Sequence, residues 1–157
     1  MKRIVRKYSH ELDATPDKVF PLLCPVREYD WLPYWSCRMM YSETGIAELD
    51  CIFQTALPGE AESIWTCSRY EPDQAIDYVV FTPGRQIHHL SIRLSQPAPG
   101  KTCLEWTRTF TAFTAEAESS LLGFIDSRLN QINEIVTLGM QHYLATGELW
   151  KPVGAAA

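Results

Sequence analysis

The sequence lacks the motifs that mark most well-defined sites. It contains no Gly-x-Ser-x-Gly, Gly-x-Gly-x-x-Gly, Walker or His-Glu-x-x-His pattern, so no nucleophile elbow, nucleotide loop or zincin helix is indicated. Its five cysteines are an odd number without any Cys-x-x-Cys, which argues against a disulfide framework and a zinc site. We therefore predict no cofactor and no metal, and we assign no catalytic residue.

Clustered positive charge is also scarce. The net charge is −5, and the only basic cluster is Lys2, Arg3, Arg6 and Lys7. Nucleic-acid binding depends on many Lys and Arg side chains against phosphates, so we expect no nucleic-acid partner. No segment approaches the roughly 20 apolar residues of a membrane span, and the N-terminus has no signal-peptide pattern. We expect a cytoplasmic protein with reduced thiols and no integral membrane segment.

What the sequence does contain is a long amphipathic helix at its end. From Thr114 to Thr146, apolar residues recur every three or four positions. A helix of this length must bury its apolar stripe against a partner. The 157 residues suit one domain, which we place at residues 1–148, with a tail at 149–157. The stripe comprises Leu121, Ile125, Leu129, Ile132, Val136, Met140 and Tyr143.

The residues before this helix have the pattern of short strands. Alternation predicts a first strand over residues 4–12, and Thr15-Pro16-Asp17 then predicts a helix start with Thr15 as its cap. A second short helix is expected from Val26 to Asp30. Turn signals such as Leu57-Pro58-Gly59 separate the later strands, so neighbouring strands must be antiparallel. The six later strands are predicted at Ser36–Ser42, Asp50–Ala56, Glu62–Tyr70, Ala75–Phe81, Gln86–Ser95 and Thr102–Phe113.

At residues 14–31, Ala14-Thr15-Pro16-Asp17-Lys18-Val19-Phe20-Pro21-Leu22-Leu23-Cys24-Pro25-Val26-Arg27-Glu28-Tyr29-Asp30-Trp31, the chain resembles a known superfamily. The resemblance is to the START-like, polyketide cyclase/dehydrase and Bet v 1-type (SRPBCC) proteins. It implies an α+β helix-grip fold, with a curved seven-stranded antiparallel sheet around the C-terminal helix and two short helices after the first strand. That superfamily includes lipid carriers, hormone receptors, cyclases and chaperone co-factors, so fold alone does not select the function.

Period-2 alternation predicts which side chains face the helix. In the last strand, Leu104, Trp106, Arg108 and Phe110 share the more apolar face, and in the strand before it His88 and Leu90 do so. A buried Arg108 needs an anionic or hydrogen-bonding partner, such as Glu62, Glu43 or a ligand carboxylate or phenolate, unless it extends to the strand end and is solvated. In the strand at 62–70, either the face of Glu62 or the face of Ser63, Trp65 and Cys67 points inward.

These inward faces predict an internal site of aromatic and polar residues, the usual form of a small-molecule site. The alternative is that the aromatic rings only pack a core. His88 is the candidate for proton transfer near neutral pH, against the alternative of a satisfied core histidine. The predicted ligand-binding residues are Trp31, Trp35, Met39, Tyr41, Tyr78, His88, Trp106, Arg108 and Phe124.

Three functions fit this pattern. The first is binding of a small hydrophobic or amphipathic molecule, such as a lipid, a polyketide or an aromatic metabolite, between sheet and helix. The second is a polyketide cyclase or dehydratase that uses the same cavity, with His88 or a carboxylate as acid or base. The third is a protein-interaction module of the chaperone-activator type, in which the interior is a packed core. The sequence specifies neither the ligand nor the oligomeric state.

Overall fold

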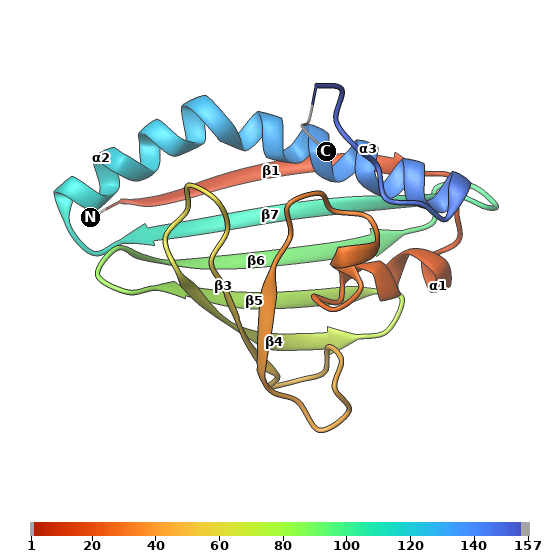
Figure 1. Ribbon diagram of the computed structural model, residues 1–157, viewed down its shortest axis with the longest axis horizontal. Helices are drawn as coiled ribbons and strands as arrows, with labels where there is room; N and C mark the ends of the chain where they lie inside the picture. The colour runs from red at the N-terminus through yellow and green to blue at the C-terminus, as the bar shows by residue number, and fades with distance from the viewer. Residues whose placement is uncertain (1, 155–157) are drawn as a thin grey trace.

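The chain folds into one curved antiparallel sheet with a long helix along it (Figure 1). The computed structural model describes residues 2–154. Its strands are β1 (Arg3–Leu12), β2 (Cys37–Tyr41), β3 (Ile52–Thr55), β4 (Ser63–Glu71), β5 (Ala75–Thr82), β6 (Gln86–Ser95) and β7 (Thr102–Ala112). Its helices are α1 (Pro16–Val19), η1 (Phe20–Leu23), η2 (Glu28–Asp30), α2 (Ala115–Phe124), η3 (Ile125–Leu129) and α3 (Asn130–Thr146).

The sheet has the strand order β1-β7-β6-β5-β4-β3-β2, and every neighbouring pair is antiparallel. The first strand therefore closes beside the last, while β2 forms the other edge. In Figure 1, β2 and β3 run steeply across the direction of the remaining strands, which shows the curvature of the sheet. The predicted helix-grip architecture of seven antiparallel strands is confirmed.

Two short helical stretches follow β1 at the expected places. Thr15 precedes α1 in an extended conformation, but its side chain makes no capping hydrogen bond. The first helix continues directly as the 3-10 turn η1. The second is shorter than predicted, because only Glu28–Asp30 is helical, in the 3-10 form.

The C-terminal helix is continuous from residue 115 to residue 146, as the periodicity predicts, but it is not uniform. The Thr114 side chain accepts a hydrogen bond from the Ala117 amide at 3.1 Å, and Gly147 ends the helix with φ of 75°. Its middle, η3, is a π-helical segment, a form that is rare and usually only one turn long. The described residues buried along the helix are Leu121, Ile125, Leu129, Asn133, Val136, Gly139 and Met140.

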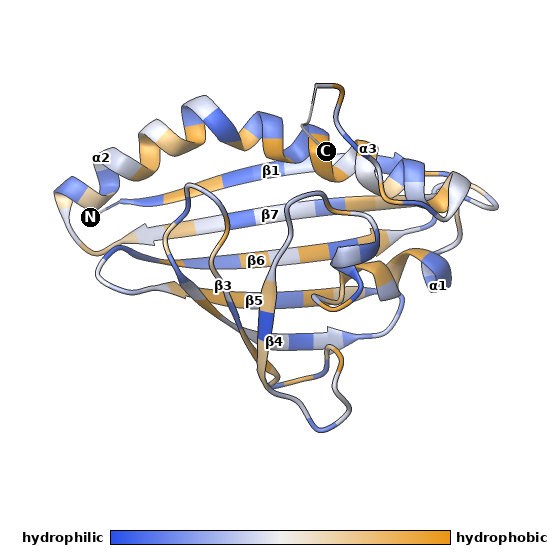
Figure 2. Ribbon diagram, viewed as in Figure 1, coloured by the Kyte–Doolittle hydropathy of each residue, from blue (hydrophilic) through white to orange (hydrophobic). Residues whose placement is uncertain are grey.

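The helix lies against β1 and β7, and its apolar side faces the sheet (Figure 2). The loop after η2 also packs on it, at Gly139. A Cβ atom there would lie 2.5 Å from the Trp31 carbonyl oxygen, so only glycine allows this approach. Trp31 is itself buried. None of the helices described for residues 2–154 is long and apolar enough to cross a membrane.

Candidate functional site

The concave face of the sheet carries the side chains that the alternation of β7 and β6 predicts. Trp106, Arg108 and Phe110 of β7 are buried, and Leu90 and Ile92 of β6 are buried beside them. In β4 the structure selects the second of the two faces left open by the sequence, because Phe53 stacks on Trp65 and Tyr78 packs against it. The region between this face and the C-terminal helix, the internal space, is therefore bounded by aromatic and polar groups, and neither the cavity beside α2 nor the one beside α1 is lined by Trp106, Tyr78 or Arg108.

Arg108 is the most unusual of these groups, with only 7% of its surface exposed. Its Nη1 donates to Asn133 Oδ1 on α3 at 2.9 Å, and its guanidinium carbon lies 5.5 Å from the centre of the Trp106 ring. No carboxylate within residues 2–154 forms an ion pair with it, so neither Glu62 nor Glu43 is its partner. Burial lowers the pKa of Arg108 from 12.5 to about 10, because the charged form has lost its hydration.

The remaining donors of this pair have no protein partner. Arg108 Nε and Nη2 and Asn133 Nδ2 donate no hydrogen bond to the described residues, and none of them is among the sealed, unpaired polar atoms of the interior. Each atom therefore keeps some accessible surface, although neither the cavity beside α2 nor the one beside α1 is lined by Arg108 or Asn133. Together they form a cationic, hydrogen-bond-donating group on the wall of the internal space, which suits an anion.

Two histidines lie near this cation. His10 Nε2 accepts a hydrogen bond from Trp106 Nε1 at 2.8 Å, and His88 stacks on Phe110 with ring centres 4.4 Å apart. Burial, followed by the charge of Arg108, lowers the pKa of His10 to about 4 and that of His88 to about 3. Both imidazoles are therefore neutral near pH 7. His88 is thus a neutral imidazole near pH 7, and its role in proton transfer stays a prediction.

A second group on the concave face is an aromatic cluster of Trp35, Phe53, Trp65 and Tyr78. Trp65 lies 5.3 Å from Phe53, 6.0 Å from Tyr78 and 6.4 Å from Trp35, measured between ring centres. The hydroxyl of Tyr78 donates to the Leu23 carbonyl at 3.0 Å, which fixes the ring. Trp35 and Trp65 keep part of their surface accessible, whereas Phe53 and Tyr78 are buried. Phe53 and Tyr78 therefore belong to the hydrophobic core, and Trp35 and Trp65 present part of their rings at its surface.

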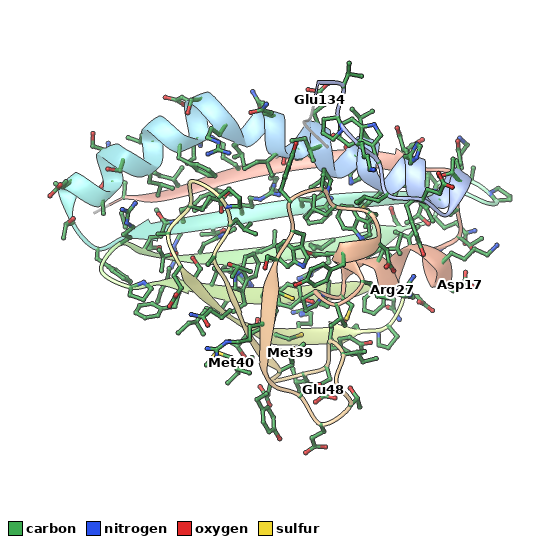
Figure 3. All side chains as sticks on the ribbon, in the orientation of Figure 1. Asp17, Arg27, Met39, Met40, Glu48 and Glu134 are labelled. Atoms are coloured by element: carbon green, nitrogen blue, oxygen red, sulfur yellow. The ribbon has the colours of Figure 1, made fainter. Side chains whose placement is uncertain are left out.

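The predicted ligand-binding residues divide according to these surroundings. Arg108, His88, Trp106 and Tyr78 lie on the concave face, and Phe124 lines a cavity described below. Trp31 is buried in the loop against the helix, with Nε1 donating to the Leu22 carbonyl. Trp35 and Met39 are half-buried; Met39 is labelled on β2 in Figure 3.

The side chain of Tyr41 points outward, whereas a ligand-binding residue was expected to point inward. It is 52% exposed, and its hydroxyl bonds to Glu43 at 3.4 Å. The β2–β3 register shifts between Met39 and Tyr41, so the alternation on which the expectation rested is broken at Met40.

A cavity of about 420 Å³ lies at one end of the internal space. Its walls are α2, with Leu121 and Phe124, and the turns that join β3 to β4 and β5 to β6. On the concave face, Gln86 borders this cavity, His88 follows one step inward, and Leu90 opposite Arg108 follows next. A second cavity of about 280 Å³, lined partly by Phe20 and Arg27, lies beside α1 and η1. No cluster of three metal-ligating side chains occurs in residues 2–154.

Comparison with known proteins supports the fold. Neither a protein-family model nor a curated protein matches the sequence. Among solved structures, the aromatase/cyclase Zhui from Streptomyces sp. R1128 has a TM-score of 0.67 at 14% identity, covering 93% of this chain and 98% of that chain. Norcoclaurine synthase from Thalictrum flavum has a TM-score of 0.61 at 12% identity, covering 87% of this chain and 86% of that chain.

The structure of Ara h 8.0201 has a TM-score of 0.58 at 11% identity, covering 88% of this chain and 98% of that chain. These structures share the helix-grip fold with this chain, which is the fold that the resemblance at residues 14–31 implies. At such low identities the similarity extends to the fold and not to individual side chains.

One residue of the site, Asn133, was not predicted from the sequence. It lies next to Ile132 of the predicted stripe, and a polar residue at that position does not indicate that its side chain points to Arg108. The sequence does contain one signal for this contact. Arg108 points inward but faces Arg6 and Leu90 on the neighbouring strands, neither of which is acidic, so a hydrogen-bond partner on the helix was to be expected.

Proposed function

We propose that the protein binds a small hydrophobic or amphipathic molecule that carries an anionic group, such as a lipid, a polyketide or an aromatic metabolite, in the internal space. The observation that carries this proposal is Arg108, a buried cation with one neutral hydrogen-bond acceptor, no anionic partner within residues 2–154 and further donors that have no partner among these residues. A carboxylate, sulfonate or phenolate of a ligand would supply the missing charge.

The apolar part of such a ligand would contribute most of the binding free energy. Burial of apolar surface contributes about 25 cal/mol per Å². The half-buried rings of Trp35 and Trp65 and the wall at Phe124 offer this surface. The cavity beside α2 supplies an entry at the end of the space nearer His88, so the anionic group would pass His88 before it reaches Arg108.

A second candidate function is catalysis of the polyketide cyclase or dehydratase type in the same space. It is favoured by the similarity to an aromatase/cyclase and by the two neutral imidazoles next to Arg108. A neutral imidazole can accept a proton from a substrate held beside it. Turnover that is lost in His88→Gln while ligand binding persists would favour this function over binding alone.

The binding proposal is tested with two fluorescent probes, the anionic 1-anilinonaphthalene-8-sulfonate and the neutral N-phenyl-1-naphthylamine. Arg108→Met should weaken the anionic probe about 10- to 100-fold, the worth of a charge-assisted hydrogen bond, and the neutral probe less than threefold. Arg6→Met is the matched control, because Arg6 lies opposite Arg108 in the β1–β7 register but is exposed. Equal losses for both probes, or no binding by the wild type, would contradict the proposal; the latter would favour the protein-interaction alternative.

A further inference from the structure

A row of polar side chains crosses the concave face at the cavity beside α2, and the binding proposal does not use it. Thr55 of β3 is opposite Ser63 of β4, and Thr82 of β5 is opposite Gln86 of β6. The hydroxyls of Ser63 and Thr82 join the two halves of this row by a hydrogen bond of 2.9 Å. Ser63, Thr82 and Gln86 all line the cavity, so the row forms one of its walls.

The Ser63–Thr82 hydroxyl pair presents hydrogen-bond acceptors to this cavity. Both residues are buried, with 9% and 7% of their surface exposed. Ser63 Oγ donates to the Ala61 carbonyl at 3.2 Å, so the proton between the two hydroxyls comes from Thr82. A hydroxyl has one proton and two acceptor lone pairs. Both protons are therefore in use, and Thr82 Oγ1 accepts no hydrogen bond from the described part of the chain, so a ligand atom here must be a donor.

The strand ends hold this pair in place opposite an apolar wall. The Thr82 carbonyl accepts a hydrogen bond from the Arg85 amide at 3.1 Å, which closes the turn between β5 and β6. The Phe113 amide donates to the Arg85 carbonyl at 2.8 Å, which ties the same turn to the segment that enters α2 (Figure 1). Leu121 and Phe124 of α2 line the cavity as well. The cavity thus combines fixed acceptors with apolar surface, and its volume of about 420 Å³ is typical of small-molecule sites.

The charges around the cavity balance, which favours an uncharged donor. Glu60 and Glu116 line it together with Arg85. A second cation, Arg128, reaches the same loop, because a Cβ atom on Gly59 would lie 3.4 Å from its Nη1. Two acidic and two basic side chains thus surround the cavity, and an ammonium group would gain little over a neutral hydroxyl.

We propose that the cavity beside α2 binds a hydroxyl group of the ligand, an alcohol or a phenol, which donates a hydrogen bond to the Ser63–Thr82 pair while its carbon skeleton packs on Leu121 and Phe124. This inference rests on the proposed binding function and narrows its ligand to molecules that carry a hydroxyl group as well as an anion. Gln86 of the polar row is opposite Ala112, four residues from Arg108 on β7, so the two sites are about 13 Å apart along the strand.

The test compares 2-naphthol with 2-methylnaphthalene, in which a methyl group replaces the hydroxyl, by equilibrium dialysis at pH 7. The wild type should bind 2-naphthol about fivefold more tightly, the usual worth of one hydrogen bond. The double variant Ser63→Ala/Thr82→Val should abolish this preference and leave 2-methylnaphthalene within twofold. Thr82→Ser should keep the preference, because it retains the hydroxyl. Thr109→Val is the matched control on the outer face of β7, and it should also keep the preference.

The outcomes separate the two proposals. If 1-anilinonaphthalene-8-sulfonate binds in an Arg108-dependent manner but 2-naphthol is not preferred, or the preference survives the double variant, the hydroxyl site is overturned and the binding function stands. If the cationic 2-naphthylmethylamine binds more tightly than 2-naphthol, the cavity selects a charge, which also overturns the hydroxyl site. If neither the dye nor the naphthalenes bind, both proposals fail. Thermal unfolding checks each variant, and Thr82→Val alone, which should at least halve the preference, serves if the double variant does not fold.

Discussion

Replacement of Arg108 by methionine should make the empty protein more stable while it removes binding of anions. Burial lowers the pKa of Arg108 from 12.5 to about 10. Each unit by which the pKa is lowered corresponds to about 1.4 kcal/mol, so the charged guanidinium destabilises the folded state by about 3 kcal/mol. Because the folded-state pKa lies below the unfolded one, the full cost is present at pH 7 and decreases only above about pH 10.

The interactions that Arg108 makes offset part of this cost. Its hydrogen bond to Asn133 contributes about 1.5 kcal/mol, and its position over Trp106 about 0.5 kcal/mol. Methionine has a similar length and no charge, so the difference leaves Arg108→Met more stable by about 1 kcal/mol, or about 2–4 °C in Tm. Urea unfolding at pH 7 measures this value directly.

Arg93→Met is the matched comparison on the outer face of the same sheet. Arg93 donates to Asp77 at 2.5 Å, and that carboxylate is only 7% exposed. Its removal leaves a buried acid with poorer partners, so this variant should lose about 1–3 kcal/mol. If instead Arg108→Met destabilises the protein by more than about 2 kcal/mol, Arg108 is a structural residue, and the argument that its charge awaits a ligand is refuted.

Three further changes test the packing and the buried acids and bases. Gly139→Ala should destabilise the protein by about 1–3 kcal/mol in urea unfolding, because its Cβ meets the Trp31 carbonyl, whereas Gly123→Ala, with nothing within 4 Å, should stabilise it by up to about 1 kcal/mol. Glu28→Gln should match the wild type near pH 4 and exceed its stability as the pH rises above 4.5, because the raised folded-state pKa makes the wild type lose stability as the carboxyl of the unfolded chain ionises; parallel pH profiles would contradict this. His88→Gln should unfold at lower pH than the wild type in an acid titration followed by tryptophan fluorescence, since the wild type loses stability as the pH falls from 6.5 toward about 3, and an unchanged midpoint would show that His88 is charged in the fold.

The fold was predictable from the sequence because several local signals agree. Alternation in β6 and β7, turn residues between strands and the 3.6-residue period of the last helix all point to one architecture. The inward direction of Arg108 follows from the same alternation, since its neighbours on that face, Trp106 and Phe110, are strongly apolar.

The partners of the site were less predictable than the fold. Asn133 follows Leu129 by four residues and precedes Val136 by three, so it lies on the predicted apolar stripe, but a polar side chain there does not by itself indicate a hydrogen bond to the sheet. The register shift in β2 turns Tyr41 outward, and it has no sequence signature here.

The buried ionisable groups themselves favour a binding or catalytic role over a packed core. Arg108, His88 and Glu28 each have a pKa displaced by burial toward the neutral form, so each lowers the stability of the empty protein near its working pH or in acid. A protein that needed only a core would be more stable with apolar side chains at these three positions. Arg108 also keeps donors that have no partner among the described residues. A ligand that supplies an anion to Arg108 would offset its cost, so the free energy of binding and the instability of the empty site are coupled.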